Sequence, residues 1–168
     1  MTSRRIFSTC MLAAVAGAAG FGAAAETVPA NGVYAVLDEG PAREALRPGP
    51  VPHLILGYDR KYSEAEKNAP ARFVALDTSR FVPLVLAFPP AAARDERGWT
   101  SLSVTLAREH AKTLEEFTRA HLQGRVAIVI DGEIVTIHKV QSVIADGKAL
   151  ITRCGDDACE TLRVKLTR

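Results

Sequence analysis

The sequence predicts an α+β protein in which a mostly antiparallel sheet carries one main helix, at about residues 107–122, packed on one face. Short runs of alternating apolar and polar residues recur along the chain, as is typical of strands with one buried face. Residues 107–122 instead repeat their apolar side chains at helical spacing. Asp131-Gly132 separates two β-branched runs, which indicates a tight antiparallel hairpin. The C-terminal pattern leaves room for a second helix.

The first 25 residues have the three parts of a cleaved secretory signal peptide. Arg4-Arg5 gives a positive start, an apolar stretch follows at residues 11–22, and Ala23-Ala24-Ala25 supplies small residues before the cleavage site. A membrane-spanning helix needs about 20 strongly apolar residues, whereas this stretch is shorter and diluted with Ala and Gly. We therefore expect a periplasmic or secreted protein whose mature part, residues 26–168, is a single domain without a membrane span.

Removal of the signal changes the charge balance, and with it the expected class of partner. The full chain has 21 Lys+Arg against 19 Asp+Glu, and loss of Arg4 and Arg5 leaves 19 of each. A formally neutral domain without a cluster of basic and aromatic residues does not favour nucleic acid as a partner.

The first half of the expected mature domain, residues 26–98, is β-rich but less regular than the second. Four prolines between residues 41 and 52 predict an extended loop, and residues 89–98 read as a polar connector rich in Pro and Ala. Pro83 predicts that its strand lies at a sheet edge or begins there, because proline cannot donate a ladder hydrogen bond. We expect strands at residues 32–37, 53–58, 72–76 and 82–88, with helical turns at 62–68.

The second half, residues 99–166, has clearer patterns. Leu102, Val104 and Leu106 alternate on one face of a strand at residues 99–106. Gly124 is the expected C-cap of the helix that follows. The buried stripe of this helix should consist of Ala111, Leu114, Phe117, Thr118 and either His121 or Leu122, and further strands are expected at 125–130, 133–137 and 149–152.

Cys154 and Cys159 are the cysteines that remain once Cys10 is removed with the signal. An even count in an oxidising compartment favours a disulfide, and no nearby His or second Cys pair completes a zinc site. Within one helix, residues five apart lie about 8 Å from each other between Cα atoms, which exceeds the disulfide range. The spacing therefore leaves two alternatives: a hairpin with both cysteines across from each other, or a helix that begins between them.

No catalytic motif is recognisable, so we expect no catalytic residue, no metal site and no cofactor. The chain has no nucleophile elbow, phosphate-binding loop or His-Glu-x-x-His motif. His110 and His121 share a helix face but lie about 16 Å apart, too far for one metal ion. The alternative is a small periplasmic enzyme or ligand-binding protein whose site is assembled from scattered residues. Such a site would bring His53, His110 or His138 beside a carboxylate in a deep pocket.

From Leu102 onward, the order of features resembles the first periplasmic head subdomain of SecD, an accessory subunit of the bacterial protein-export translocase. That family has a strand ending in Leu, a helix with Ala and a late Thr, a Gly before an apolar strand ending in Asp-Gly, and an Ile–Gly–Ile-Thr ending. The matching positions are Leu106, Ala111, Thr118, Gly124, residues 126–132, Val135, Ile144, Gly147 and Ile151-Thr152. The resemblance covers roughly residues 99–166. It departs from the family at Thr136-Ile137-His138, in place of a Ser-Ala-Pro-like step, and at Arg153, where Gly is common.

The resemblance implies a non-enzymatic protein that binds a peptide or protein partner in the cell envelope, with a link to protein export. It also favours a helix after Cys154 over the hairpin, since the family continues there into a helix. Proton-driven translocation is not implied, because the expected mature chain shows no membrane span and no place for a proton relay. An exposed strand can hold an extended chain by backbone hydrogen bonds. Our candidate binding edge consists of Val82, Leu84, Leu86 and Phe88.

Overall fold

The computed structural model describes residues 29–63, 66–96 and 98–168. The predicted signal peptide, residues 1–25, therefore lies outside the described residues. A turn of 3-10 helix at Arg43–Ala45 separates the first two strands. In chain order the other elements are β1 (Gly32–Gly40), β2 (His53–Tyr58), β3 (Arg72–Pro83), β4 (Ala91–Arg94), β5 (Thr100–Thr105), α1 (Arg108–Ala120), β6 (Arg125–Ile130), β7 (Glu133–Lys139), β8 (Lys148–Cys154) and α2 (Asp156–Leu166).

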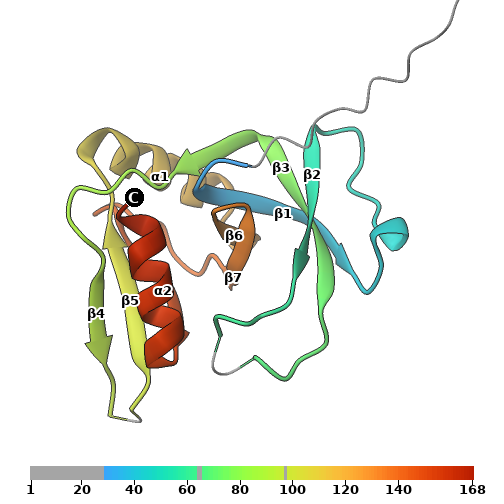
Figure 1. The fold of residues 1–168 in the computed structure, drawn as a ribbon. Coiled ribbons are helices and arrows are strands. Elements are labelled where there is room, and N and C mark those ends of the chain that lie inside the picture. Colours follow the sequence, from blue (N-terminus) through green and yellow to red (C-terminus); the bar gives the residue numbers. More distant parts are fainter. Residues whose placement is uncertain (1–28, 64–65, 97) are drawn as a thin grey trace, which may run out of the picture.

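The strands form two antiparallel sheets (Figure 1). The larger sheet has the order β2-β3-β1-β6-β7, and the smaller has the order β4-β5-β8. α1 packs against β3, and α2 lies alongside β5. The predicted α+β class, with its main helix and a second C-terminal helix, is confirmed. No helix among the described residues is long and apolar enough to cross a membrane.

The five-stranded sheet buries side chains on both of its faces. Along β6, Val126 and Ile128 belong to one apolar core, whereas Ala127 and Val129 belong to another. The first core is shared with α1, α2 and the three-stranded sheet. The second core is enclosed by the larger sheet itself, whose end strands β2 and β7 contact each other. A strand with two buried faces explains why β6 is an unbroken apolar run in the sequence.

The three-stranded sheet buries only one face. Leu102, Val104 and Leu106 are each at most 3% exposed, as their alternation predicted. α2 covers this face with the buried side chains of Cys159 and Leu162. The opposite face of the same sheet carries polar and small residues and the exposed Leu150.

β1 connects the two halves of the chain. It pairs with β3 on one side and with β6 on the other, so that Val33 is the register partner of both Val82 and Ile128. Strands from residues 26–98 and from residues 99–166 are therefore neighbours in one sheet. Residues 99–166, the half with the more regular sequence pattern, therefore do not form a separate sheet.

The strand expected at residues 72–76 extends to Pro83 as the long β3, which takes in only the first two residues of the strand expected at 82–88. β1 follows β3 through two register irregularities, which let one partner strand pair with both ends of the long strand. Residues 84–88 continue only as an isolated bridge between Leu86 and Leu106. The sequence pattern did not indicate that the strand continues through residues 77–80, because these residues are polar and resemble a loop. In the structure they are exposed or partly exposed.

Two further local predictions are wrong. The expected connector at residues 89–98 contains β4, since β5 supplies the hydrogen-bonding partner that a run of alanines does not predict. The described residues of 62–68 lie in turns rather than in a helix, with Ala69 N donating to Glu66 O at 2.8 Å. Residues 91–94 thus form a strand because they pair with β5, and tight local turns take the place of the helix expected at 62–68.

The predicted hairpin at Asp131-Gly132 is confirmed, with positive φ angles of 50° and 76° that fit a turn of type I′. The C-cap prediction at Gly124 is wrong. α1 ends at the C-cap His121, and Gln123 takes the positive φ of 66°. Gly124 is needed for a different reason, because a Cβ at this position would lie 2.9 Å from the carbonyl oxygen of His121.

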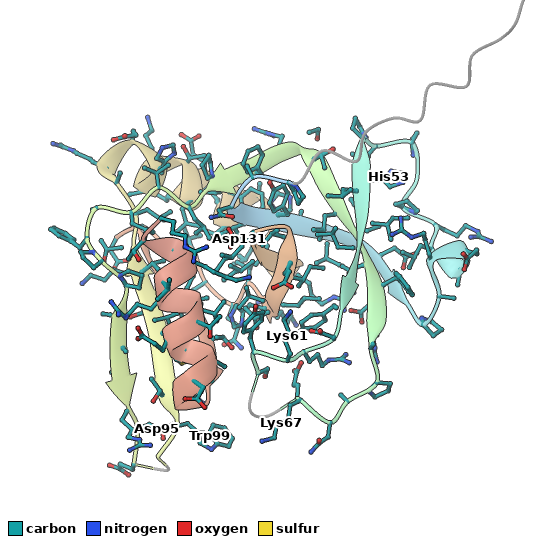
Figure 2. The ribbon with its side chains drawn as sticks, viewed as in Figure 1. His53, Lys61, Lys67, Asp95, Trp99 and Asp131 are labelled. Atoms are coloured by element: carbon teal, nitrogen blue, oxygen red, sulfur yellow. A yellow bond between two sulfur atoms is a disulfide. The ribbon has the colours of Figure 1, made fainter. Side chains whose placement is uncertain are left out.

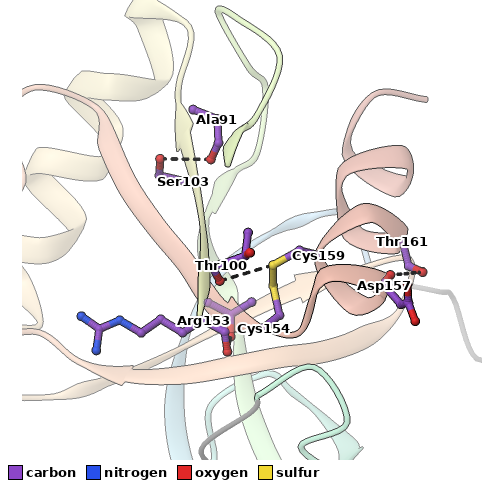
Figure 3. Close-up of a disulfide and its surroundings, with 9 residues drawn as sticks. Ala91, Thr100, Ser103, Arg153, Cys154, Asp157, Cys159 and Thr161 are labelled. Atoms are coloured by element: carbon purple, nitrogen blue, oxygen red, sulfur yellow. Dashed lines mark hydrogen bonds between the residues drawn. A yellow bond between two sulfur atoms is a disulfide. The ribbon is translucent and has the colours of Figure 1, made fainter. Parts of the chain in front are cut away.

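Cys154 and Cys159 form a disulfide with their Cα atoms 5.4 Å apart (Figure 3). Cys154 ends β8, and α2 begins at Asp156, so the helix starts between the two cysteines. This settles the alternative that the spacing left open, in favour of the helix. Sγ of Cys159 also lies 3.4 Å from the carbonyl oxygen of Thr100, so the first turn of α2 lies beside β5.

Candidate binding groove

A groove opens where α1, the end of β7 and the start of β8 meet. Its cavity has a volume of about 230 Å³. Most of its lining is apolar: Val33, Leu114, Val126, Ile128, Val140, Ile144, Ala149 and Leu150. Polar groups come from Thr118, His138, Lys139, Gln141 and Ser142. A cavity of this size and lining suits an apolar side chain that enters from solvent.

The loop at residues 140–147 contributes to one wall of the groove, and hydrogen bonds hold both of its ends. Val140 N donates to the carbonyl of Gly124 at 2.9 Å, and its own carbonyl accepts from Gln123 N at 2.8 Å. At the other end, the carbonyl of Gly147 accepts from Leu106 N at 3.0 Å. The loop is thus tied to the turn after α1 and to the end of the β5 segment.

α1 positions the middle of this loop as well as its end. Oγ1 of Thr118 donates to the carbonyl of Leu114 at 2.8 Å and accepts from Ile144 N at 3.1 Å. Gly147 has a φ of 68°, and a Cβ there would lie 2.7 Å from Cβ of Ala111, so only glycine lets the loop come this close. Ala111, Thr118 and Gly147 are positions that carry the sequence resemblance. Here they shape a wall of the groove.

His138 connects the edges of the two sheets beside the groove. It belongs to β7 of the larger sheet, and its Nε2 lies 3.1 Å from the carbonyl oxygen of Ile151 on β8 of the smaller sheet. Because a carbonyl only accepts hydrogen bonds, Nε2 is the donor and carries a hydrogen. One of the departures from the family pattern, Thr136-Ile137-His138, therefore supplies a link between the sheets.

The structure separates the residues of the predicted binding edge. Val82 and Leu84 are buried, at 0% and 8% exposed, whereas Phe88 is 66% exposed. Ala87 N donates to Thr105 O at 2.9 Å, and Val85 O accepts from Ala107 N at 2.8 Å.

Leu86 stands between these two hydrogen bonds, directly opposite Leu106. In such a pair the backbone N–H and C=O of Leu86 point away from the partner strand. The exposed part of the predicted edge is thus Leu86 to Phe88.

A second hollow lies beside Phe88. It has a volume of about 290 Å³ and is lined by Leu86, Ala87, Phe88, Pro89, Leu166 and Thr167. The last turn of α2 therefore borders the exposed part of the predicted edge. Sequence reasoning missed this neighbour, because Leu166 is far from Phe88 in the chain.

A cluster of charged residues and one tyrosine links three distant segments near the C-terminal end of α2. Glu133, in the β6–β7 hairpin, accepts from Lys61 Nζ at 2.6 Å, from Tyr62 Oη at 2.7 Å and from Lys165 Nζ at 3.1 Å. Lys165 Nζ also lies 3.7 Å from Oδ2 of Asp131, which is beside the C-terminal end of α2 in Figure 2. We call these five residues the Glu133 cluster.

Contacts within the Glu133 cluster shift the pKa values of Glu133 and Tyr62. Partial burial alone would raise the pKa of Glu133, but the hydrogen bonds from Lys61, Tyr62 and Lys165 lower this pKa to about 2. Burial and the bond to Glu133 raise the pKa of the Tyr62 hydroxyl. The carboxylate is therefore charged at any pH where the protein is expected to work, which suits a structural tie.

Of the residues that the structure describes, His53, His110 and His138 do not line the deep pocket with a carboxylate that the enzymatic alternative requires. The lining of the groove contains His138 but no carboxylate, and the separate cavity lined by His53, a residue labelled in Figure 2, has no carboxylate in its lining either. His110 lies half-buried on α1. Among the described residues, no group of three or more His, Cys, Asp or Glu side chains could hold a metal ion.

Residues 90–166 match the family model described as SecDF, P1 head subdomain. This confirms the resemblance seen in the sequence and extends it from residue 99 back to residue 90, which brings β4 into the matched region. The matched region contains most of the groove lining, all of α2 and the disulfide.

One curated relative is named Protein translocase subunit SecDF, from Thermus thermophilus, and is 38% identical over 60 residues. The aligned part is 36% of this chain but only 8% of the length of that relative. Among solved structures, a membrane component SecDF that enhances protein export is 33% identical, over 50% of this chain and 39% of that chain, with a TM-score of 0.42. SecDF in a super-membrane-facing form is 32% identical, over 54% and 12%, with a TM-score of 0.44.

Proposed function

We propose that this chain is an exported, non-enzymatic protein of the cell envelope that binds an extended polypeptide, and that this binding serves protein export. The match of residues 90–166 to the SecDF P1 head subdomain supports a role linked to export. The similarity to a relative named as a protein translocase subunit supports the same link. Residues 1–25 would be removed as a signal peptide and residues 26–168 would act as one domain.

One observation carries the proposal: residues that define the resemblance build the groove. Ala111, Thr118 and Gly147 are not placed to do chemistry, and their contacts instead hold the 140–147 loop as a wall of an apolar cavity. Residues that shape an apolar cavity of about 230 Å³ without placing reactive groups in it support binding rather than catalysis.

The strand beside the groove offers a way to hold an extended chain. β8 pairs with β5 and stands at an end of the smaller sheet. Away from the contact between His138 and Ile151, an extended partner could lie along β8 and insert an apolar side chain into the groove. The exposed part of the predicted edge, Leu86 to Phe88, is a second candidate surface with its own hollow.

Site-specific photo-crosslinking in the full chain tests both surfaces. A photoreactive phenylalanine analogue replaces Leu150 at the groove, Phe88 at the predicted edge or Thr161 on the exposed side of α2 as the control. Each variant is exposed to a panel of synthetic unfolded peptides. We expect cross-links from position 150 well above those from position 161. Absence of cross-links at both 150 and 88 would overturn the proposal, and cross-links at 88 alone would transfer binding to the predicted edge.

N-terminal sequencing of the protein from the periplasmic fraction tests the export part of the proposal. We expect Glu26 as the first residue. A protein that keeps Met1 or stays in the cytoplasm contradicts this part and leaves the groove proposal to be judged by the cross-links.

A further inference from the structure

We infer that the groove and the outer face of β8 select polypeptide segments in which acidic residues flank an apolar one. This inference rests on the proposed function and names the chemistry of the partner. It starts from the face of the three-stranded sheet that α2 does not cover. That face is where β8 presents its exposed side chains.

The register of the small sheet places three exposed side chains of β8 on this outer face. Lys148 pairs with Thr105, Leu150 with Ser103 and Arg153 with Ser101. These β5 residues alternate with the buried Leu102 and Val104, so they point away from α2. An irregularity at Ile151 brings Arg153 to the same side as Leu150, although the two are an odd number of residues apart. Figure 3 shows Arg153 extending away from α2.

The charge on this face has one sign. Lys148 and Arg153 stand on either side of Leu150, and Lys139 lies at the rim of the groove that Leu150 also lines. The remaining outer positions of the sheet are Ser101, Ser103 and Thr105 on β5 and Ala91 and Ala93 on β4, none of which is acidic. The carboxylate of Asp146, just before β8, accepts from the backbone N–H of Lys148 at 3.1 Å.

Two basic side chains on the helices are neutralised by acidic residues of the same helix. Lys112 pairs with Glu116, and Arg163 bonds Glu160 at 2.6 Å. By contrast, no ion pair joins Lys139, Lys148 or Arg153 to any acidic side chain within the described part of the chain. Unneutralised cations around an exposed apolar mouth favour a partner with complementary negative charge.

The spacing defines the partner further. Leu150 is 42% exposed and stands two residues from Lys148 and three from Arg153. A strand rises about 3.3 Å per residue and places alternate side chains on one face. We consider an extended segment beside β8 with an apolar residue opposite Leu150. Its side chains two residues before and two residues after that apolar residue would then face the two cations, Lys148 and Arg153. The matching pattern is an apolar residue with Glu or Asp two positions before and after it.

Binding of a fluorescent peptide to the full chain tests the inference. The probe contains Glu-Thr-Leu-Thr-Glu, and matched peptides carry Gln or Lys in place of both Glu. We expect the Glu peptide to bind about three- to tenfold more tightly than the Gln peptide at low salt. The preference should shrink at high salt, since exposed charges are screened. The double variant K148Q/R153Q should lose this preference, and the control K112Q/R163Q should keep it.

The outcomes separate this inference from the proposed function. If Glu and Gln peptides bind equally well, or if the control variant loses the preference as fully as K148Q/R153Q, the charge selectivity is wrong while polypeptide binding stands. If none of the three peptides binds and position 150 gives no cross-link to any peptide of the panel, binding at the groove itself is wrong. Circular dichroism of both double variants checks that the exposed substitutions leave the fold intact.

Discussion

The two ends of α2 are held in different ways. At its start, the disulfide from Cys159 to Cys154 joins it covalently to β8, five residues back in the chain. At its end, Lys165 bonds Glu133 and so reaches the β6–β7 hairpin and, through the same carboxylate, Tyr62. The first tie is local in sequence, and the second joins segments far apart. Between them, Leu162 is fully buried in the core.

A local tie can thus be inferred from a sequence pattern, whereas a long-range tie depends on the whole fold. The two ties should also respond to different conditions. A disulfide responds to reductant but little to pH or salt, whereas the Glu133 cluster responds to acid and salt but not to reductant.

Removal of the Leu162 side chain should have the largest effect, because it takes away the core contact that both ties support. We expect Leu162→Ala to lower the free energy of unfolding by about 3 kcal/mol, from lost burial and the cavity left behind. Urea unfolding followed by circular dichroism measures this. Substitution of the exposed Val164 by Ala is the matched control, and an equal loss there would show that α2 is not anchored through Leu162.

Removal of the covalent tie comes next. Cys154→Ala combined with Cys159→Ala should lower the free energy of unfolding by about 2 kcal/mol, since the disulfide closes only a short loop. Reductant should have no further effect on this variant. If the wild-type protein unfolds at the same urea concentration with and without reductant, the disulfide does not stabilise the start of α2.

Loss of the charged tie should cost less. Glu133→Gln should lower the free energy of unfolding at pH 7 by about 1 kcal/mol, because the side chain of Glu133 is 40% exposed and solvent weakens its ion pairs. The pKa of Glu133 is lowered in the folded state to about 2 from an ordinary value of 4.5. Its stabilisation is therefore fully present above pH 4.5 and disappears as the pH falls toward 2.

Urea unfolding of the wild type and Glu133→Gln across this pH range measures the difference. The two proteins should converge in stability as the pH approaches 2. A difference that stays constant down to pH 2 would mean that the substitution removes a packing contact and not a charge.

A single exposed ion pair should matter least. Lys112 Nζ lies 3.9 Å from Glu116, and their side chains are 80% and 70% exposed. Lys112→Ala should change the free energy of unfolding by less than about 0.5 kcal/mol. A change as large as that of Glu133→Gln would show that clustering of charges around Glu133 brings no advantage.

Much of the fold follows from local pattern. The alternation of Leu102, Val104 and Leu106, the helical stripe around Leu114 and the Asp131-Gly132 turn all led to the correct elements. β4 and the long β3 could not be predicted, because alanines and polar residues form strands there only through their partner strands. The predicted edge illustrates the same limit: β1 covers Val82, which the sequence alone leaves exposed.

The candidate groove was predictable only in part. The positions Ala111, Thr118 and Gly147 were visible as a family pattern, but their common task required the loop and the helix to be seen together. The Glu133 cluster had no signal in the sequence, since Lys61, Glu133 and Lys165 each look like ordinary surface charges. They meet only because the fold brings three distant segments to one side of α2.

Three features could be inferred from the order of the amino acids alone: the class of the fold, the pairing of Cys154 with Cys159, and the resemblance of the second half to the SecDF head. Each depends on neighbours in the chain or on a short pattern, where local geometry restricts the choices. Two others needed the folded chain: the joining of both halves in one sheet by β1, and the gathering of basic residues around the mouth of the groove. These features depend on contacts between distant residues, which no local pattern encodes.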